Sequence, residues 1–450
     1  MPDATARPAR RGHRALLGIA LLVGLSGCET ARLTITDGTG PYPTLPPPVS
    51  ALVPTGVIAQ AVGWAAGQTP TPAPGFAVQA YAQGLDHPRW LYRLPNGDIL
   101  VAETNAPART ATPGLRERIA GWLMQRAGAS TPSADRITLL RDADGDGRAE
   151  VRQVFLSGLH SPFGMALVEG RLYVANADAV VSVAYRDGDL QAREQPVLLT
   201  ALPGGPRNHH WTKSLVASPD GRHLYVGVGS NSNVAENGLE EETGRAAIHE
   251  IDLPGGVSRL HASGLRNPVG MAWTTGPAPR LWVVVNERDE LGSDLVPDYL
   301  AAVEPGAFYG WPWRYFGDHV EARVAPPDPA VVARVRRPDY ALGPHTASLG
   351  LQWLASGPLH GVLGDGMVIG QHGSWNRRPP SGYRVIHVPF ADGQPQGLPR
   401  TVLSGFLDAD GQARGRPVGV AQDGRGALLV ADDVGNVVWR VTRITTSGAP

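Results

Sequence analysis

The sequence predicts an all-β protein: a six-bladed β-propeller with loop insertions and short helical insertions. Two observations carry this prediction. The 450 residues include 56 glycines and 41 prolines but only 5 methionines and 7 phenylalanines, which favours many short strands joined by turns over a helical bundle. In addition, one pattern occurs six times along the chain: a polar or proline start, a short apolar strand, a turn with glycine, and a second apolar strand.

The six repeats follow one another in phase. They start at His87, Ser161, Trp211, Asn267, Thr346 and Arg416. One propeller blade takes roughly 40 to 50 residues, so each repeat fits one blade plus loop insertions. A β-sandwich with coincidental turns is the alternative, and six copies in phase argue against it. The propeller domain is predicted over residues 76–445.

A helical insertion is predicted inside the first blade, within residues 106–133. The segment 115–128, LRERIAGWLMQRAG, has apolar residues at helical spacing with charges between them. In a propeller, blade insertions gather over one face, where ligands bind near the central channel.

Residues 1–27 are predicted to be a lipoprotein signal peptide. Four arginines precede an apolar stretch from Ala15 to Leu25, which is too short to span a bilayer and fits the core of a secretory signal. The sequence Leu-Ser-Gly-Cys that follows resembles a bacterial lipobox, and Cys28 is the only cysteine of the chain. We therefore expect Cys28 to carry lipid and to anchor the protein in the bacterial cell envelope. Glu29 after the cysteine favours the outer membrane, facing the periplasm.

Residues 28–75 are predicted to be a tether, because the stretch after residue 37 is rich in proline, threonine, glycine and alanine. The apolar stretch 53–67 can instead cover one end of the domain. The formal net charge of the whole chain is −1. Such a balance offers no electrostatic footprint for nucleic acid, and we set that class of partner aside.

Two adjacent histidines, His209 and His210, open the third repeat. Adjacent side chains on a strand point to opposite faces, so one of the two can face the channel. A histidine at that place is suited to act as a general base near neutral pH. The alternative is a pair that only hydrogen-bonds loops.

Arginines open the fourth and sixth repeats. Arg266 precedes one, and Arg414 and Arg416, two residues apart, can lie on the same side of an extended segment. Guanidinium groups that converge on a channel suit a multiply anionic ligand, because they pair with carboxylates in bidentate fashion. A set of surface salt bridges is the alternative.

Two acidic segments suit Ca²⁺, which prefers oxygen ligands. The first is the run 286–290 together with Asp294 and Asp298, for which a solvated charge run is the alternative. The second is a loop with acids at positions 1, 3 and 5 and glycine at position 6, formed by Asp142, Asp144, Asp146 and Gly147. Position 12 of this loop is glutamine, and the spacing is equally typical of a tight Asp-Gly hairpin.

Three stretches together resemble one known family. They are GLDHPRWLYRLPNGDILVAE from Gly84, GLRNPVGMAW from Gly264, and Tyr-Gly-Trp-Pro from Tyr309. The sequence from about residue 74 to 443 resembles the quinoprotein sugar dehydrogenases, most closely the sorbosone dehydrogenase-like branch related to soluble glucose dehydrogenase. The resemblance implies a six-bladed propeller that holds pyrroloquinoline quinone (PQQ), a tricarboxylate, over its channel beside a Ca²⁺ ion. It also implies that a histidine removes the substrate's hydroxyl proton while hydride passes to the quinone.

The resemblance assigns roles to particular residues. His210 matches the catalytic base, and Arg266, followed by Asn267, matches the arginine beside the quinone oxygens. Arg414 and Arg416 match the arginines that hold the cofactor's carboxylates.

Other positions depart from the family pattern. The calcium-binding backbone carbonyls align with Arg288 and Asp289, where better-known members have Gly-Pro. Arg377 is predicted to replace the family's lysine near the cofactor, and Ser230 stands where an acid normally pairs with the catalytic histidine. Asp178 and Glu241 are the candidates to substitute for that acid, which leaves open what orients His210, and His345 and His372 are further candidates to face the channel.

The sequence therefore predicts a PQQ-dependent enzyme that oxidises a sugar or sugar-derived aldehyde and passes electrons to a respiratory-chain acceptor or a small carrier. One alternative is a metal-dependent propeller hydrolase or lactonase, in which polar residues at strand ends converge on the axis. Its candidate ligands are Glu103, Asn176, Asn231, Asn286 and Asp432. The other alternative is a non-catalytic binding propeller attached to the envelope.

Overall fold

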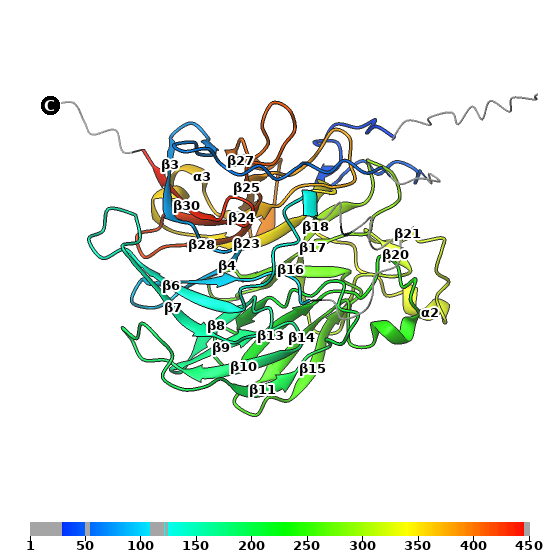
Figure 1. The fold of residues 1–450 in the computed structure, drawn as a ribbon. Coiled ribbons are helices and arrows are strands. Elements are labelled where there is room, and N and C mark those ends of the chain that lie inside the picture. The colour runs from blue at the N-terminus through cyan, green and yellow to red at the C-terminus, as the bar shows by residue number, and fades with distance from the viewer. Residues whose placement is uncertain (1–28, 50–54, 109–120, 122–124, 445–450) are drawn as a thin grey trace, which may run out of the picture.

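The six-bladed β-propeller predicted from the sequence is confirmed. The structure is a computed structural model that describes residues 29–49, 55–108, 121 and 125–444. Six antiparallel sheets follow one another around a central axis (Figure 1). Each of the six repeats supplies the inner pair of strands of one sheet.

The blades are built as follows, from inner to outer strand. Blade 1 holds β4 (Pro88–Arg93), β5 (Ile99–Glu103), β6 (Arg136–Arg141) and β7 (Val151–Ser157). Blade 2 holds β8 (Met165–Val168), β9 (Arg171–Ala175), β10 (Ala179–Ala184) and β11 (Val197–Ala201). Blade 3 holds β12 (Leu215–Ala217), β13 (His223–Val228), β14 (Ala247–Asp252) and β15 (Ser258–Ser263). Blade 4 holds β16 (Asn267–Trp273), β17 (Leu281–Asn286), β18 (Pro297–Val303) and β22 (Tyr340–Pro344). Blade 5 holds β23 (Ser348–Leu354), β24 (Gly366–Gln371), β25 (Arg384–Ala391) and β27 (Arg400–Ser404). Blade 6 holds β28 (Pro417–Gln422), β29 (Leu428–Asp432), β30 (Val437–Arg443) and β3 (Phe76–Gln83).

Short elements decorate this framework. The strand β19 (Ala307–Phe308) runs parallel to β15, β20 (Arg314–Tyr315) pairs with β21 (His319–Val320), and β26 (Gln394–Pro395) pairs with β25. The helices α2 (Pro329–Val332) and α3 (Gly357–Leu363) and the 3₁₀ turn η1 (Leu239–Glu242) lie in connections.

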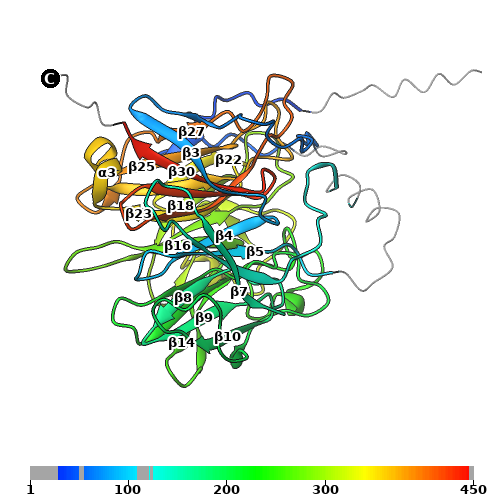
Figure 2. The same cartoon turned by 60° about the vertical axis from the view of Figure 1, so that its left-hand side comes forward.

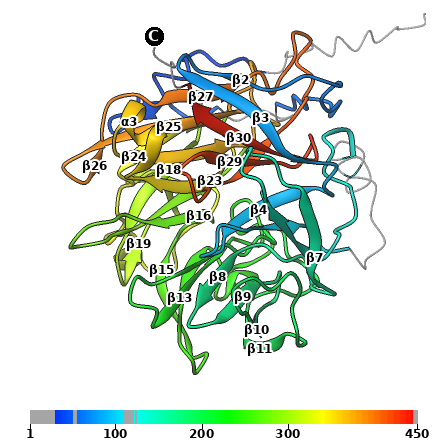
Figure 3. The same ribbon diagram turned by 90° about the vertical axis from the view of Figure 1, so that its left-hand side faces the viewer.

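Blade 6 closes the ring by combining the two ends of the domain. Its outer strand β3 comes from the start of the domain and pairs with β30, with Phe76 opposite Arg443 and Gln83 opposite Val437 (Figure 3). An N-terminal strand paired in this way leaves no gap between the first and last blades. The two ends of the domain thus hold the ring together.

The axis is packed by a motif that four of the six repeats share, an apolar residue followed by glycine. In blade 4, a Cβ on Gly270 would lie 2.6 Å from the Leu349 carbonyl oxygen, and in blade 5, one on Gly350 would lie 2.1 Å from that of Val418. Glycine at these positions lets each inner strand lie directly against the next one. One core cluster contains an apolar residue from every blade: Trp90, Phe163, Trp211, Val269, Leu349 and Val418.

The antiparallel order places two sets of positions at one end of the propeller, here called the site face. These are the starts of the inner strands and the ends of the second strands. The opposite end, the far face, carries the turns that join the first strand to the second and the third to the fourth. The loop of Asp142, between β6 and β7, therefore lies on the far face.

The N-terminal segment, residues 29–49 and 55–75, packs on the propeller, which differs from the predicted tether. Its strand β1 (Thr39–Gly40) pairs with β22, and β2 (Thr71–Pro72) pairs with β27. In Figure 2 the segment, drawn in blue, lies along the edge of the molecule that carries β27. Trp64 packs edge-on against Phe406 and Trp439. The apolar side chains explain the difference, because burying them against the blades is favourable. This agrees with the alternative that the apolar stretch covers one end of the domain.

Two predictions fall on residues outside this description. The signal peptide and Cys28 lie before residue 29, and most of the predicted helix 115–128 lies within 109–124. Among the helices formed by the described residues, none has the length and apolar character to cross a membrane.

Candidate functional site

His210 lies on the site face, just before β12, and its ring is oriented by the backbone of the loop that follows β13. Nδ1 lies 2.8 Å from the carbonyl oxygen and 3.0 Å from the hydroxyl oxygen of Ser230. Because a carbonyl can only accept, Nδ1 carries the proton and Nε2 is left unprotonated in the neutral ring. The carbonyl of Ser230 thus orients the ring, a role for which Asp178 and Glu241 were the candidates.

Those two acids have other partners. Asp178 lies 2.9 Å from Nδ1 of His160, and Glu241 lies 3.5 Å from the side-chain amide of Asn231. Removal of His210 from water, with the positive charge of Arg266 nearby, lowers the pKa of His210 well below its ordinary 6.5. The ring is therefore neutral at pH 7 and able to accept a proton at Nε2.

Arg266 is buried beside His210, and its guanidinium is held by two loops. Nη1 donates to the carbonyl of Glu287 at 2.7 Å, while Nε and Nη2 donate to the backbone and side-chain oxygens of Asn233 at 3.2 and 3.0 Å. Nη2 also pairs with the Asp289 carboxylate at 3.2 Å. Five donors in a fixed plane make such a guanidinium a rigid source of positive charge.

The Tyr-Gly-Trp-Pro motif contacts the same loop that holds this arginine. The indole nitrogen of Trp311 donates to the carbonyl of Asn233 at 2.9 Å, the same oxygen that accepts from Arg266. The motif and the arginine, more than 40 positions apart in sequence, therefore share one backbone carbonyl. Their joint occurrence has a structural reason.

Asn267 brings an amide oxygen into the same place. Its Oδ1 is buried and has no hydrogen-bond partner among the described residues. A Cβ on Gly229 would lie 2.4 Å from that oxygen and 2.5 Å from Cβ of His210, so only glycine permits this approach. A buried polar atom without a partner is costly, which is typical of a site that awaits a ligand.

A second group, at the junction of blades 5, 6 and 1, contains Arg416. The Arg416 guanidinium donates to the carbonyls of Ala59 at 3.3 Å and His372 at 3.5 Å, and it stacks over Tyr383 at 4.9 Å. Close to it, Arg89 donates to the buried Asp433 carboxylate at 2.9 Å. The group thus holds two neighbouring guanidiniums, of which only that of Arg89 pairs with the one carboxylate, and this leaves an excess of positive charge.

The Nε atoms of Arg89 and Arg416 are buried and find no acceptor within the described part of the chain; we call them the open donors. Asp433 accepts from Nε2 of His372 at 2.9 Å as well, and His87 lies 3.5 Å away. Burial lowers the pKa of His372 to about 4 despite this carboxylate, so both rings are neutral at pH 7. The open donors together with the excess charge suit an anionic ligand.

Sequence reasoning missed Arg89, although the repeats contain the signal. The repeats align Arg89 and Lys213 with apolar residues at the axis, such as Phe163 and Val418. Lys213 is fully buried and donates to the Trp211 carbonyl at 3.0 Å. A cation at a position that is otherwise apolar is the sign that could have been read from the sequence.

Arg414 and Arg377 lie in different surroundings from Arg416. Arg414 is half-buried, and its backbone nitrogen donates to the carbonyl of Phe406 at 2.8 Å. Arg377 is buried, donates to the carbonyls of Pro379 and Leu33, and lies 3.7 Å from Asp294. Arg377 thus contacts the N-terminal segment, a setting that the family resemblance did not suggest.

The predicted calcium carbonyls at Arg288 and Asp289 follow β17 on the site face. The Asp289 carbonyl oxygen accepts from Nε of Arg288 at 2.9 Å, from Nη2 of the same side chain, and from the amide of Asn233 at 3.3 Å. The Asp289 carboxylate binds Arg266 and the amide of Asn376. A cationic side chain therefore already lies where the resemblance places calcium, so that the residues present do not fit the ion at this carbonyl.

Two clusters on the far face also gather possible metal ligands. In the predicted loop, one carboxylate oxygen each from Asp142, Asp144, Asp146 and Glu150 lie within 4.8 Å of one another. Asp142 also accepts from the backbone nitrogens of Gly145 at 2.7 Å and Gly147 at 3.0 Å, which is the geometry of a tight Asp-Gly turn. Both predicted interpretations of this loop are compatible with its geometry.

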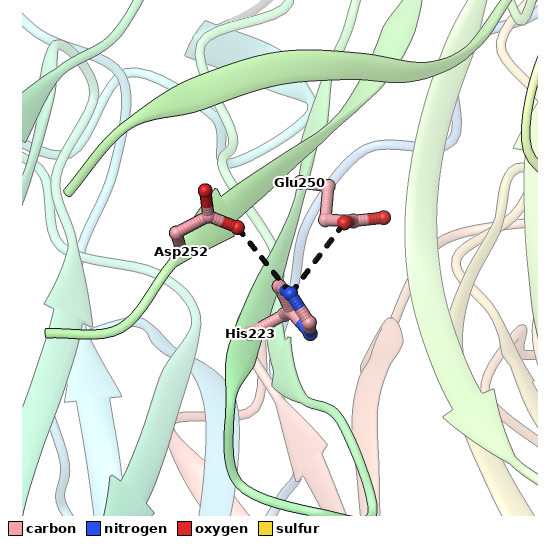
Figure 4. Close-up of side chains that lie close together, drawn as sticks. All are labelled: His223, Glu250 and Asp252. Atoms are coloured by element: carbon pink, nitrogen blue, oxygen red, sulfur yellow. Dashed lines mark ion pairs between the residues drawn. The ribbon is translucent and has the colours of Figure 1, made fainter. Parts of the chain in front are cut away.

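The second cluster, His223, Glu250 and Asp252, lies at the far end of β13 and β14 (Figure 4). Nε2 of His223 lies 3.3 Å from Asp252 and 3.8 Å from Glu250. Arg259 pairs with both carboxylates and supplies the positive charge that a metal ion would supply. This cluster is therefore an ion-pair network, and the channel end of the site face remains the candidate active site.

Fold and site together define the class of protein. The chain is a six-bladed propeller similar to the PQQ-dependent sugar dehydrogenases, as the sequence resemblance predicted. One family model, described as a domain of unknown function (DUF7133), matches residues 95–275, and another, described as TrAA12-like, matches residues 322–444.

Particular relatives sharpen this similarity. The pyrroloquinoline quinone-dependent pyranose dehydrogenase of Coprinopsis cinerea is 26% identical over 339 residues, a match that covers 61% of this chain and 45% of that enzyme. The chain thus spans less than half the length of this relative. The holo form of the PQQ domain of the C. cinerea pyranose dehydrogenase covers 86% of this chain and 100% of its own, with TM-score 0.64 and 21% identity. The match to the calcium structure of the Trichoderma reesei family AA12 protein covers 87% of this chain and 100% of that chain, with TM-score 0.66 and 18% identity. At these identities the solved structures establish the fold.

Proposed function

We propose that this chain is a PQQ-dependent oxidoreductase that oxidises a sugar or a sugar-derived aldehyde. The observation that supports the proposal most strongly is the pair of buried open donors on Arg89 and Arg416. They belong to a group on the site face that carries more positive than negative charge. The similarity to PQQ-dependent sugar dehydrogenases supports the same assignment.

The residues present fit the quinone. PQQ is a tricarboxylate, and a buried group with two guanidiniums and one carboxylate offers charge and donors for carboxylate oxygens. Arg266 and the buried amide oxygen of Asn267 offer further polar atoms on the other side of the channel. We propose Arg89, Arg266, Asn267 and Arg416 as the residues that hold the cofactor, and Arg414 and Arg377 as weaker candidates.

His210 is the proposed general base. The quinone, when bound, supplies the hydride acceptor of the reaction. Nε2 of His210 accepts the proton of the substrate hydroxyl, and the Ser230 carbonyl keeps the ring in the tautomer that makes this possible. The guanidinium of Arg266, fixed by Asn233 and Glu287, stabilises negative charge that develops on oxygen nearby.

The alternative of a metal-dependent hydrolase gains no support from its candidate ligands, because each is engaged within its own surroundings. Their partners are as follows: Glu103 with Arg136 and Thr138, Asn176 with the backbone of His160, Asn231 with the backbone of His209, Asn286 with the backbone of Ser348, and Asp432 with Trp64 and Trp439. Ligands turned toward one metal ion would instead converge on a common point.

The setting of the enzyme is proposed from the sequence. A lipid on Cys28 would attach it to the bacterial cell envelope, facing the periplasm, and a respiratory-chain acceptor or a small carrier would take its electrons. Labelling with radioactive palmitate in a bacterial host, with Cys28→Ser as control, tests the anchor.

A cofactor titration tests the proposed activity. PQQ is added to purified apoprotein, and the quinone absorbance is followed during addition of aldoses and sugar aldehydes. Stoichiometric binding with substrate-driven bleaching is the expected result. If no quinone binds with or without Ca²⁺, the proposed function is wrong, and lactone hydrolysis in the presence of divalent metals becomes the next assay.

A further inference from the structure

The buried side chain of Arg288 lies at the position that the family resemblance assigns to calcium. Only 1% of this residue is exposed, although it belongs to a loop at the end of β17. A buried arginine in a loop needs several partners to offset its loss of hydration. Those partners show what the side chain does.

The guanidinium turns back onto the carbonyl of the following residue. Both Nε and Nη2 donate to the Asp289 oxygen, the first at 2.9 Å. The amide of Asn233 donates to the same oxygen at 3.3 Å. A carbonyl oxygen has two lone pairs, so these donors already fill its capacity.

The guanidinium is also held at its other edge. Nη1 pairs with the carboxylate of Glu321, which is itself buried and accepts in addition from Arg323 at 3.3 Å. A buried charge pair of this kind resists separation, because each partner would be left without compensation. The side chain is therefore fixed against the carbonyl from both sides.

Asp289, the residue that carries this carbonyl, is fixed as well. Oδ1 of Asn233 accepts from the backbone nitrogen of Asp289 at 2.9 Å and from Arg266 at 3.0 Å. The Asp289 carboxylate accepts from Arg266 at 3.2 Å and from Asn376 at 2.7 Å. Arg288 therefore contacts the backbone carbonyl of an immobilised residue, Asp289, and Arg266 contacts the carboxylate of the same residue, on the site face.

We infer that the guanidinium of Arg288 takes the place of the calcium ion at the Asp289 carbonyl, so that this chain binds its quinone without calcium at that position. Like the ion, the guanidinium is a positive charge in contact with this backbone oxygen. The inference rests on the proposed function for its quinone, but its statement about calcium can be tested without one.

The first experiment compares quinone binding with and without calcium. The background is the Asp144→Asn/Asp146→Asn variant, which removes acids of the far-face loop. After dialysis against EDTA, PQQ is titrated in EDTA and in about 5 mM Ca²⁺, above the Kd range of weak extracellular calcium sites. We expect the two affinities to agree within about twofold and the protein to retain no stoichiometric calcium by mass spectrometry. Tightening by more than about tenfold, with one calcium ion retained per chain, would overturn the inference.

Arg288→Met in the same background removes the cation. Its quinone affinity should fall by about tenfold or more in EDTA and recover in part on addition of calcium, which can then reach the carbonyl. Arg323→Met is the matched control, because it also touches Glu321 but not the carbonyl; it should stay independent of calcium. An unchanged affinity of Arg288→Met in EDTA would show that the guanidinium has no such role.

If Arg288→Met does not fold, Arg288→Lys is used as the second variant. Lysine keeps the charge, and we expect calcium-independent binding with a smaller loss of affinity; acquired calcium dependence would contradict the inference. If the unmodified chain binds no PQQ at all, the proposed function fails. The inference is then tested by calcium retention alone. We expect the background protein to retain no calcium ion and Arg288→Met to retain one.

Discussion

Two groups of arginines and carboxylates lie at opposite ends of the propeller. On the site face, Arg89 pairs with the Asp433 carboxylate, Arg416 lies near Arg89, and the open donors remain buried. On the far face, the single guanidinium of Arg259 pairs with both Glu250 and Asp252 and is half exposed. The residue types are the same in both groups.

What differs is the balance between burial and pairing. In the far-face network the Arg259 guanidinium pairs with both carboxylates and keeps contact with water. Such a network stabilises the blade modestly and needs no ligand. The site-face group keeps donors in the interior and carries more positive than negative charge. A structure tolerates such a cost where a ligand supplies the missing acceptors.

The largest effect should come from removing the proposed base on the site face. In His210→Ala, kcat should fall by about 10² to 10⁴-fold, because no side chain takes the hydroxyl proton. His223→Ala, at the far face, should keep full activity. Steady-state kinetics with PQQ-loaded protein measures both, and full activity of the His210 variant would refute the assignment.

The next largest effect should be on cofactor affinity. Arg416→Ala should weaken PQQ binding by about 30-fold or more, the cost of truncating one partner of a buried, hydrogen-bonded charge pair. Arg259→Ala should bind PQQ as the unmodified chain does. A titration of quinone absorbance compares the two, with thermal unfolding to confirm that both are folded. Equal affinities would remove the distinction between the two groups.

The pH dependence of stability sharpens the comparison further. The pKa of His372 is lowered to about 4 in the folded chain from 6.5, so between these values the unfolded chain binds a proton that the folded chain excludes. Stability should therefore fall as the pH falls from 7 to 5. His372→Gln should remove about 1 to 2 kcal/mol of that fall. Urea unfolding at the two pH values measures the difference, and identical pH profiles would contradict it.

The smallest effect should come from the far-face network itself. Arg259→Ala should lower the midpoint of thermal unfolding by less than about 3 °C, because exposed ion pairs contribute little. Calorimetry checks this. A much larger decrease would mean that the network holds blade 3 together, and the contrast between the two faces would need revision.

Several features of the site follow from local pattern. The six repeats predicted the blades, and the residues at repeat starts, such as His210, Arg266 and Arg416, lie on the site face as a result. Strand alternation is a short-range property, and an inner strand brings its first residues to the same face in every blade. The apolar-glycine pairs near the axis are visible in the sequence for the same reason.

Other features depended on contacts between distant parts of the chain. The Ser230 carbonyl that orients His210 comes from the loop after β13, 20 positions away, and a backbone atom leaves no trace in residue identity. The N-terminal segment, predicted as a tether, binds Arg416 through the carbonyl of Ala59. A composition rich in proline and glycine describes the segment's flexibility in isolation but not the apolar surface that it meets.

Short-range sequence patterns determine the number of blades, the face that carries the site and the residue types of that site. The reason is that strand period and turn chemistry act over a few residues. Packing determines which donors stay unpaired and which carbonyl accepts from Arg288. It also determines which of the two arginine groups can bind a ligand. The physical reason is that hydrogen-bond satisfaction depends on every atom that comes within about 3 Å, and most of those atoms belong to residues far away in the sequence.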